Sequence, residues 1–477
     1  MTLPGAAAAC ATAPAAPYDP RYDPLADAHP GRGRDYAPTY WVATAGEPPA
    51  DDGPVQGDMD VDVAIVGSGF TGLATALFLA REHGIRAVVL EANRSAWGCT
   101  SRNGGQGQNA SGRLYRSQWL ARWGRETALA LDAEIREGYD TFKGLVAEFP
   151  ACEPQSGGHL CIAHRDKKMT FLRHEAKVMR EVFGYDVRLL SPAEVASRYV
   201  RDAETHGALH ESEGIGVHPL KLAYGYLRAA RAAGARIHPA SPVLGMHTQG
   251  GVHHLRTPAG TVRARAVGFA TGGYTSNGLH ASLDSKIMPI LSNSLVTRPL
   301  TPAELEATNF RTNEVITDTR TLRFYYRKLP DNRVQIGSRS SITGADAPNP
   351  KHMAVLVNGL HRKFPALRGI DIDYSWWGWV DVSHDMMPRI AQPDPAQGVF
   401  YALGYGGNGV SFSAHAGRRM AERIAGRRRK ALALPIYDSP LEYPNLFELV
   451  RSRAFAPFRR FGQRFLYRWY YLRDEVL

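Results

Sequence analysis

Three glycines, Gly67, Gly69 and Gly72, have the spacing G-x-G-x-x-G, and they are the residues that most clearly predict ligand chemistry. In this pattern the first glycine permits a tight turn, the second lets the backbone approach a pyrophosphate, and the third lets a helix pack closely on a strand. Glu91 follows Gly69 by 22 residues. An acidic side chain at about that distance accepts hydrogen bonds from a ribose hydroxyl. The spacing therefore predicts a dinucleotide site.

The segments around these glycines have the order that such a site requires. Residues 61–66 form an apolar run typical of a buried strand, residues 70–82 place Ala, Leu and Phe at helical spacing, and residues 87–90 form a second apolar strand. Gly84 ends the helix, whose first turn offers free N–H groups and partial positive charge to phosphates. The alternative is a glycine turn in an ordinary βαβ unit, but the complete series favours the dinucleotide.

Two further glycine-rich stretches are candidates for ligand contact. Residues 95–113 follow no helical or strand pattern, and a long loop of this kind usually has a function, although a plain surface loop is the alternative. In this loop Arg102 is suited to a phosphate or a flavin oxygen. Residues 398–426 read as strand, glycine loop and helix, so a second helix N-terminus would stabilise negative charge on a ligand.

The composition bounds the class of protein. A chain of 477 residues is longer than one hydrophobic core accommodates, so we expect two domains. No apolar run has the length of a membrane-spanning helix. The net charge of +11 is scattered, which argues against nucleic acid. The four cysteines form no CxxC pair, so we expect neither a metal site nor a redox dithiol. Few cysteines and a poor secretory signal favour the cytoplasm.

The rest of the chain predicts a second, β-rich unit. Residues 117–149 and 166–183 read as helices, and Ser191 before a proline predicts another helix start. Residues 287–340 contain several strands, and the turn LPDNR predicts a hairpin. Residues 370–382 carry three tryptophans. We expect this half to form a sheet that roofs a pocket.

The motifs GSGFTG with LEA, CTSRNGGQ and GYGGNGVSFSAHAG together resemble the FAD-dependent amine and amino-acid oxidases of the D-amino-acid oxidase superfamily, in particular its gamma-glutamylputrescine oxidase-like branch. The resemblance extends from Tyr40 to Arg473. It implies an α/β (α+β) fold, in which a discontinuous Rossmann-like FAD-binding domain carries a substrate domain built on a mixed β-sheet.

The composition of residues 1–39, rich in Ala and Pro, predicts a flexible or draped N-terminal arm. The resemblance implies how the rest of the chain is divided. The FAD-binding domain would comprise residues 40–116, 214–280 and 385–430, and the substrate domain residues 117–213 and 281–384. Residues 431–477, which are aromatic and basic, would be a C-terminal docking segment, with an amphipathic membrane-surface helix as the alternative.

Carried over residue by residue, the resemblance implies which residues bind the cofactor. The pyrophosphate would be bound by Gly67, Ser68, Gly69, Thr71 and Gly72, the adenosine ribose by Glu91, and the adenine by Val243. The isoalloxazine would lie against Arg102, Asn103, Gly104, Gly105 and Gln106, and Gly272 would end the third cofactor-binding segment. The pyrimidine edge of the flavin would lie at Gly406, Gly407, Asn408, Gly409 and Val410. We expect the FAD to be non-covalent, with Cys99 as the one residue to test for a covalent bond.

The implied reaction is oxidation of an amine C–N bond by hydride transfer to the flavin, followed by hydrolysis of the imine and reoxidation by O2 or another acceptor. The substrate would be a small amine or amino acid, with a gamma-glutamylputrescine-like molecule favoured. No catalytic base is required, and Tyr326, Trp376 and His384 are pocket candidates. The alternatives are an NAD(P)H-linked flavin monooxygenase or reductase, which would usually carry a second G-x-G-x-x-G, and a non-catalytic FAD-binding protein.

Overall fold

Strand β1 (Met59–Val66) lies inside an eight-stranded sheet and organises one half of the molecule. The computed structural model describes residues 16–276, 278–284, 286–383, 385–427, 434–437 and 456–477. β1 pairs in parallel with β2 (Val88–Leu90) on one side and with β12 (Gly260–Phe269) on the other. Its last four residues are buried, as expected for an apolar run between two neighbours. The last residues of all three strands are in register, so their carboxyl ends share one edge of the sheet.

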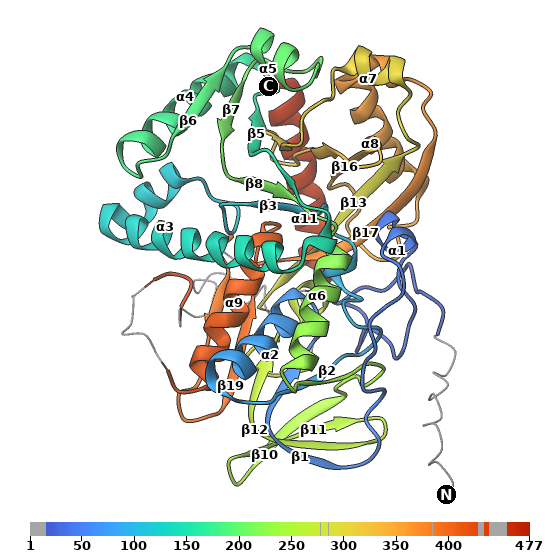
Figure 1. Cartoon of the computed structure of the whole chain (residues 1–477), viewed down its shortest axis with the longest axis vertical. Helices are drawn as coiled ribbons and strands as arrows, with labels where there is room; N and C mark the ends of the chain where they lie inside the picture. The colour runs from blue at the N-terminus through green and yellow to red at the C-terminus, as the bar shows by residue number, and fades with distance from the viewer. Residues whose placement is uncertain (1–15, 277, 285, 384, 428–433, 438–455) are drawn as a thin grey trace, which may run out of the picture.

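Helices cover one face of this first sheet. α2 (Phe70–His83), α6 (Pro219–Ala232) and α9 (Gly409–Ile424) lie side by side over it (Figure 1) and share one apolar core with it. Gly84 ends α2 in the left-handed conformation, as the sequence predicts. The remaining strands of the sheet are β9 (Arg236–His238), β10 (Gly245–Gln249), β11 (Val252–Thr257), β18 (Arg389–Ala391) and β19 (Val399–Leu403).

The second half contains another eight-stranded sheet, in the order β17-β13-β16-β15-β14-β5-β7-β6. β14 runs parallel to β5 and the other neighbours are antiparallel, so the prediction of a mixed sheet is confirmed. The predicted hairpin is β15 with β16. The bounds are β5 His159–Ile162, β6 Val187–Leu190, β7 Ala208–Glu211, β13 Met288–Thr297, β14 Val315–Asp318, β15 Tyr325–Lys328, β16 Val334–Ser338 and β17 Ile372–Val382.

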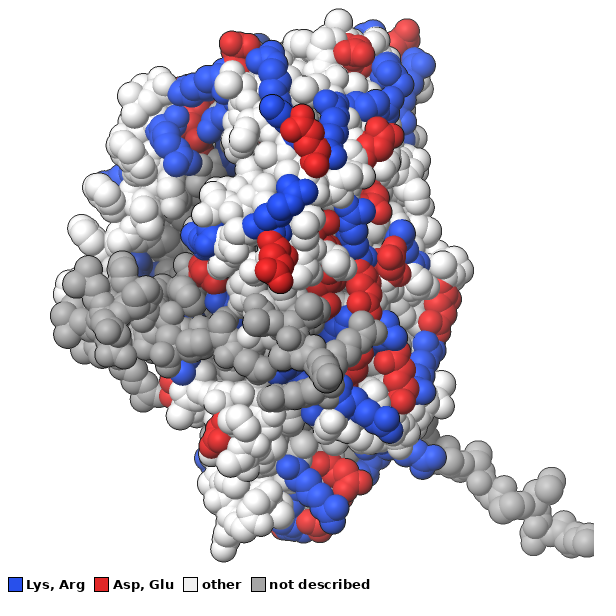
Figure 2. Space-filling view, turned by 90° about the vertical axis from the view of Figure 1, so that its left-hand side faces the viewer, with Lys and Arg blue, Asp and Glu red and all other residues white. Residues whose placement is uncertain are grey.

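A small third sheet, β3 (Gln106–Gln108), β8 (Gly214–Gly216) and β4 (Gln155–Ser156), lies between the two larger ones (Figure 1). The helices outside the first sheet are α1 Tyr40–Thr44, α3 Arg116–Glu148, α4 Asp166–Glu181, α5 Pro192–Arg198, α7 Pro302–Thr308 and α8 Pro350–Lys363. α3 and α4 match the helices predicted from the sequence, and Ser191 caps α5 through a hydrogen bond from the Glu194 N–H. Figure 2 shows basic and acidic side chains side by side over much of one face.

Of the two forms expected for the N-terminal arm, flexible or draped, residues 16–39 have the draped one, while residues 1–15 lie outside the described residues. The Tyr22 ring stacks on Tyr274 with the ring centroids 5.9 Å apart, and both rings are buried. Asp23 is buried and forms an ion pair with Arg460. Aromatic side chains in a Pro-rich segment thus attach it to the body, which composition alone did not reveal.

The C-terminal helix α11 (Ala456–Tyr471) continues into a single π-helical turn, Leu472–Val476. It passes beside the second sheet, as Figure 1 shows in red. Besides its ion pair with Asp23, Arg460 donates a hydrogen bond to the Pro289 carbonyl oxygen (3.1 Å). Within the described residues, no helix is long and apolar enough to span a membrane.

Candidate functional site

A cavity of about 370 Å³ opens at the carboxyl edge of the first sheet. Its walls include the ends of β1 and β2 and the residues that follow β12 and β19. Ligands of open α/β sheets bind at this edge, because the loops that leave parallel strands gather there. The cavity then continues under the second sheet, where Ser292 and Tyr325 line it. Residues 28–30 of the N-terminal segment close its other end, beside Val243.

The glycine turn after β1 has the geometry that a pyrophosphate requires. Gly67 has φ +101°, which is unfavourable for other residues. A Cβ on Gly72 would lie 1.8 Å from the Gly67 carbonyl oxygen. A Cβ on Gly417 in α9 would lie 2.6 Å from the Thr71 carbonyl oxygen. The start of α2 is therefore held between its own loop and α9 by contacts that only glycine permits, and Gly69, Phe70 and Thr71 line the cavity there.

Glu91 lies at the end of β2 and is held in place by the same loop. Its carboxylate accepts hydrogen bonds from the Ser68 N–H (3.0 Å), the Ser68 hydroxyl (2.8 Å) and the Asn93 N–H (3.0 Å). Burial raises the pKa of Glu91, and these donors oppose the rise. Glu91 lines the cavity, whereas Ser68 acts from behind it. The carboxylate is thus positioned in advance for a hydroxyl ligand.

The loop after β2 brings Arg102 to the cavity wall in an unexpected environment. Its guanidinium carbon lies 4.2 Å from the centre of the Trp97 ring and 5.3 Å from that of Tyr274. Arg102 Nε and Nη2 are buried and have no hydrogen-bond partner among the described residues. The Tyr18 ring is a third neighbour, with its centre 5.1 Å away, and stacking on three aromatic rings fixes the charge without satisfying its donors. A polar ligand group in the cavity would satisfy them.

The loop after β19 forms the opposite wall. Gly404, Gly406 and Gly407 all have positive φ. The Asp381 side chain accepts a hydrogen bond from the Gly404 N–H, and the Asp381 carbonyl oxygen accepts one from the Gly406 N–H (2.9 Å). Burial raises the pKa of Asp381. Asp381 lines the cavity, yet its carboxylate serves to hold the turn that begins α9.

Three arginines that the sequence did not single out line the same end of the cavity: Arg113, Arg323 and Arg339. A Cβ on Gly407 would lie 3.0 Å from Arg339 Nη2 and 3.9 Å from Arg113 Nη1, so both guanidinium groups reach this glycine. Arg323 Nε is buried without a hydrogen-bond partner. Burial, together with the charges of Arg339 and Arg323, lowers the pKa of Arg113. The three residues lie far apart in the chain, and no spacing could have linked them.

Backbone carbonyl groups, rather than carboxylates, hold these arginines. Arg113 donates to the Thr321 carbonyl oxygen (3.0 Å) and Arg339 to that of Gly406 (3.3 Å). No carboxylate forms a salt bridge with any of the three in the described part of the chain. We refer to Arg113, Arg323 and Arg339 as the arginine cluster. It concentrates positive charge at this end of the cavity.

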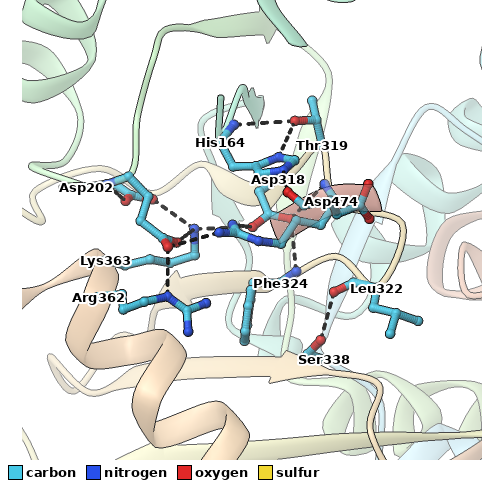
Figure 3. A network of polar contacts seen from close by, with 12 residues as sticks. His164, Asp202, Asp318, Thr319, Leu322, Phe324, Ser338, Arg362, Lys363 and Asp474 are labelled. Atoms are coloured by element: carbon cyan, nitrogen blue, oxygen red, sulfur yellow. Dashed lines mark hydrogen bonds and ion pairs between the residues drawn. The ribbon is translucent and has the colours of Figure 1, made fainter. Parts of the chain in front are cut away.

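A buried ionic network holds the loop that carries Arg323 (Figure 3). The ammonium group of Lys363 lies 3.2–3.3 Å from the carboxylates of Asp202, Glu204 and Asp318, and Lys363 is fully buried. Asp318 accepts a hydrogen bond from the Phe324 N–H (3.1 Å). Asp474 accepts one from the Thr321 N–H and so connects the C-terminus to this loop. The network fixes residues 318–324 above the cavity.

One group of described residues has the composition of a metal site: Glu134, Glu137 and His415. Arg419 donates to Glu134 (2.7 Å) and to Glu137 (2.6 Å), and His415 is hydrogen-bonded to Glu134 (2.6 Å). Arg419 already supplies the positive charge that a cation would bring. We therefore interpret the group as a polar contact between α3 and α9.

Most of the residues predicted to contact a cofactor line the cavity. These are Gly67, Gly69, Thr71, Glu91, Arg102, Asn103, Gly104, Gln106, Val243, Gly272, Gly406, Gly407, Asn408, Gly409 and Val410. Ser68 and Gly72 support the glycine turn from behind, as described above. Gly105 lies away from the cavity, since a Cβ there would lie 2.2 Å from the Val217 carbonyl oxygen.

The pocket candidates need correction. Tyr326 is fully buried in the core of the second half, where its hydroxyl donates to Asp202, and it does not line the cavity. Trp376 donates to the Arg102 carbonyl oxygen (2.8 Å) and packs on Trp41, again away from the cavity. Tyr325 lines the cavity instead, because side chains alternate between the two faces of a strand. His384 lies outside the described residues.

The chain has a mixed α/β fold in which a second sheet lies over the edge of the first sheet where the cavity opens. Comparison with solved structures shows this fold in glycine oxidase from Geobacillus kaustophilus, with a TM-score of 0.66, 21% identity and coverage of 80% of this chain and 98% of that one. L-proline dehydrogenase from P. horikoshii has the same TM-score of 0.66 at 17% identity, with 80% and 96% covered.

Sequence comparison identifies the family. The model of the DAO family, described as FAD dependent oxidoreductase, matches residues 62–423, and the chain belongs to this family. Gamma-glutamylputrescine oxidoreductase of Escherichia coli is 34% identical over 80% of this chain and 88% of its own length. The probable oxidoreductase OrdL of Haemophilus influenzae is 29% identical, with 81% and 87% covered. The predicted superfamily, flavin dependence and oxidoreductase class are thereby confirmed.

Proposed function

We propose that this enzyme oxidises the C–N bond of an amine that also carries a carboxylate, with a gamma-glutamylputrescine-like substrate favoured. The observation that carries the proposal is the arginine cluster, three cationic side chains that line the cavity without a carboxylate partner in the described part of the chain. A relative of this chain, gamma-glutamylputrescine oxidoreductase of Escherichia coli, is named for a substrate whose glutamyl part carries a carboxylate. Putrescine alone brings only positive charge, which the cluster would repel.

We further propose how the chain holds FAD. The start of α2 and the turn at Gly67–Gly69 would bind the pyrophosphate, Glu91 the adenosine ribose, and Val243 the adenine. Residues 102–106 and 406–410 would flank the isoalloxazine. The Cβ-intolerant turn at Gly72 and the unsatisfied donors of Arg102 fit such a ligand. We also retain as a proposal the division into an FAD-binding domain of residues 40–116, 214–280 and 385–430 and a substrate domain of residues 117–213 and 281–384.

Non-covalent binding of FAD is part of the proposal. Cys99 lines the cavity, and burial raises the pKa of its thiol to about 12. A thiol protonated at neutral pH is a poor nucleophile, because the thiolate is the reactive form. We therefore expect acid precipitation to release all of the flavin into the supernatant. Flavin that stays with the protein pellet of the wild type and not of Cys99→Ser would overturn this point.

The residues of the chain position and enclose the substrate, and bound FAD would supply the acceptor for the hydride. The arginine cluster would bind the carboxylate and so fix where the amine end lies. The Tyr325 hydroxyl, which is hydrogen-bonded to the hydroxyl groups of Ser292 (3.0 Å) and Ser294 (2.9 Å), lines the same end. A neutral amine needs no separate base, and water would hydrolyse the imine product after release. O2 or another acceptor would complete the cycle.

Anaerobic reduction of the flavin by a panel of amines tests the proposal. We expect gamma-glutamylputrescine to bleach the flavin absorbance, and putrescine to do so at least tenfold less efficiently, since one charge-assisted contact contributes about 1.5–3 kcal/mol. Sarcosine, glycine and larger amino acids place the carboxylate at different distances from the amine and so measure the length of the site. Readmitted oxygen, followed by a peroxide assay, identifies the acceptor. Equal bleaching by putrescine, or no bleaching by any amine, would refute the proposal.

A further inference from the structure

Helix α11 carries two faces of opposite character, and the contacts with other described elements come from one of them. Its inner face is attached to the body through Arg460, beside which Gln463 is buried, and the turn that follows is attached through the buried Asp474. These positions lie on one side of a helix with 3.6 residues per turn. The inner face alone therefore accounts for the docking of the helix.

The outer face of α11 is a continuous apolar stripe. The exposed fractions are 69% for Phe461, 68% for Phe465 and 47% for Trp469, and these residues follow one another at helical spacing. Phe458 continues the stripe at one end, and Leu472 and Val476 continue it at the other, all of them exposed. Contiguous exposed apolar patches mark interaction surfaces, whereas single exposed side chains do not. Because defined contacts hold the inner face of the helix to the body, this exposure is not caused by detachment of the helix.

The charges beside the stripe are all of one sign. Arg464 and Arg468 are exposed on its flank, one turn apart. The acidic residues nearby are engaged with the body: Asp474 is buried, and Glu475 is paired with Arg320. The face is thus aromatic at its centre and cationic at its edge. Aromatic rings favour the depth of lipid headgroups, and arginines attract anionic lipids.

We propose that the outer face of α11 binds the surface of an anionic lipid bilayer. Phe461, Phe465 and Trp469 would enter the headgroup region, and Arg464 and Arg468 would contact lipid phosphates. A second copy of the chain would bring the same arginines against each other, which favours the lipid over self-association. The proposal is independent of the amine substrate, because no residue of the stripe lines the cavity.

Sedimentation with vesicles of stated composition tests the proposal on the full chain loaded with flavin. We expect binding to vesicles of phosphatidylcholine with phosphatidylglycerol, weak binding to phosphatidylcholine alone, and release by salt, since salt screens the attraction. Phe461→Ser with Phe465→Ser should lower the partition coefficient at least tenfold. Arg464→Gln with Arg468→Gln should lower it about 25-fold, or about fivefold for each charge.

Matched controls distinguish lipid binding by α11 from nonspecific binding through other exposed apolar side chains. Met353→Ser with Val355→Ser removes two apolar side chains that are 40% and 41% exposed on α8, and this variant should bind like the wild type. Flavin content and thermal unfolding should be unchanged in all three double variants. A brominated lipid should quench part of the tryptophan emission of the wild type and less of that of Trp469→Phe.

Two results would overturn the proposal. One is a wild-type chain that does not sediment with anionic vesicles. The other is a dimer in sedimentation velocity that Phe461→Ser with Phe465→Ser dissociates, which would assign the stripe to self-association. Either result leaves the proposed amine oxidation untouched, because bleaching of the flavin is measured without lipid.

Discussion

Replacing Gly72 with alanine tests the cofactor site at the point where the structure leaves least room. The added Cβ would lie 1.8 Å from the Gly67 carbonyl oxygen and 3.4 Å from the Ala270 Cβ. Contacts of real Cβ atoms essentially never fall below 3.0 Å, so the helix and the loop must separate by about 1 Å or more. Helix α2 cannot retreat, because Gly417 of α9 already touches its first turn.

The remaining way to relieve the contact is a movement of the Gly67 turn into the cavity, where the pyrophosphate is proposed to bind. Overpacking of this kind costs about 1–3 kcal/mol, and the clamped helix places Gly72→Ala at the upper end. A penalty of about 3 kcal/mol that falls on the flavin-bound state lowers the affinity for FAD about 150-fold. We therefore expect a folded protein of lower thermal stability that is purified largely without its yellow colour.

The measurements are the ratio of flavin absorbance to protein absorbance after purification and the thermal unfolding midpoint with and without added FAD. The control is Gly144→Ala in α3, where no atom lies within 4 Å of the added Cβ. Alanine at that helical position should be neutral or stabilising. Full flavin content and an unchanged midpoint in Gly72→Ala would refute the assignment of this turn to the pyrophosphate.

Three further predictions follow from the charged groups. Arg339→Met should raise the KM for a carboxylate-bearing amine about 10- to 150-fold, with a smaller change in kcat. The exposed Arg228→Met should leave the KM unchanged. An unchanged KM in Arg339→Met would remove Arg339 from the substrate site. Lys363→Met leaves the buried carboxylate of Asp202 without its cation, whereas Glu204 and Asp318 keep their ion pairs with Arg320. It should cost about 3–5 kcal/mol in urea unfolding, against at most about 1 kcal/mol for the exposed Lys351→Met on the same helix. Equal costs would contradict the network. Burial, with two nearby cations, lowers the pKa of His218 to about 3, below the usual value near 6.5. Between these two pH values only the unfolded chain binds the extra proton, so the free energy of unfolding should fall with falling pH by at most about 1.4 kcal/mol per pH unit. His218→Asn should flatten that slope in urea unfolding measured from pH 7 to 5. Parallel slopes for the wild type and the variant would refute the prediction.

Local patterns predicted those parts of the fold whose causes are local. The Gly67 turn, the end of α2 at Gly84 and the cap at Ser191 depend on backbone conformation and on hydrogen bonds within a few residues. The alternation of strands and helices around residues 59–90 follows from hydrophobic spacing in the same way. These local features predicted β1, α2 and β2 and the turn between them, which lie where the cavity opens.

The choice between Tyr325 and Tyr326 shows where local reasoning ends. Both are aromatic residues in one predicted strand, and the sequence analysis selected Tyr326 for the pocket. In the structure Tyr325 faces the cavity, and Tyr326 faces the core beside Lys363. Neighbouring side chains of a strand point to opposite faces, so an assignment that is one residue off reverses the result. Register depends on the pairing of β15 with β14 and β16, which is not encoded locally.

The sequence by itself determined the class of cofactor, because a pyrophosphate site is built from one turn and the helix that follows it. Only the tertiary structure decided which charges line the cavity. Arg113, Arg323 and Arg339 come from three separate segments, and residues 28–30 reach the far end of the cavity from an arm that composition predicted to be flexible or draped. These residues meet because the two sheets and the loops between them pack together, and no residue spacing along the chain predicts that packing.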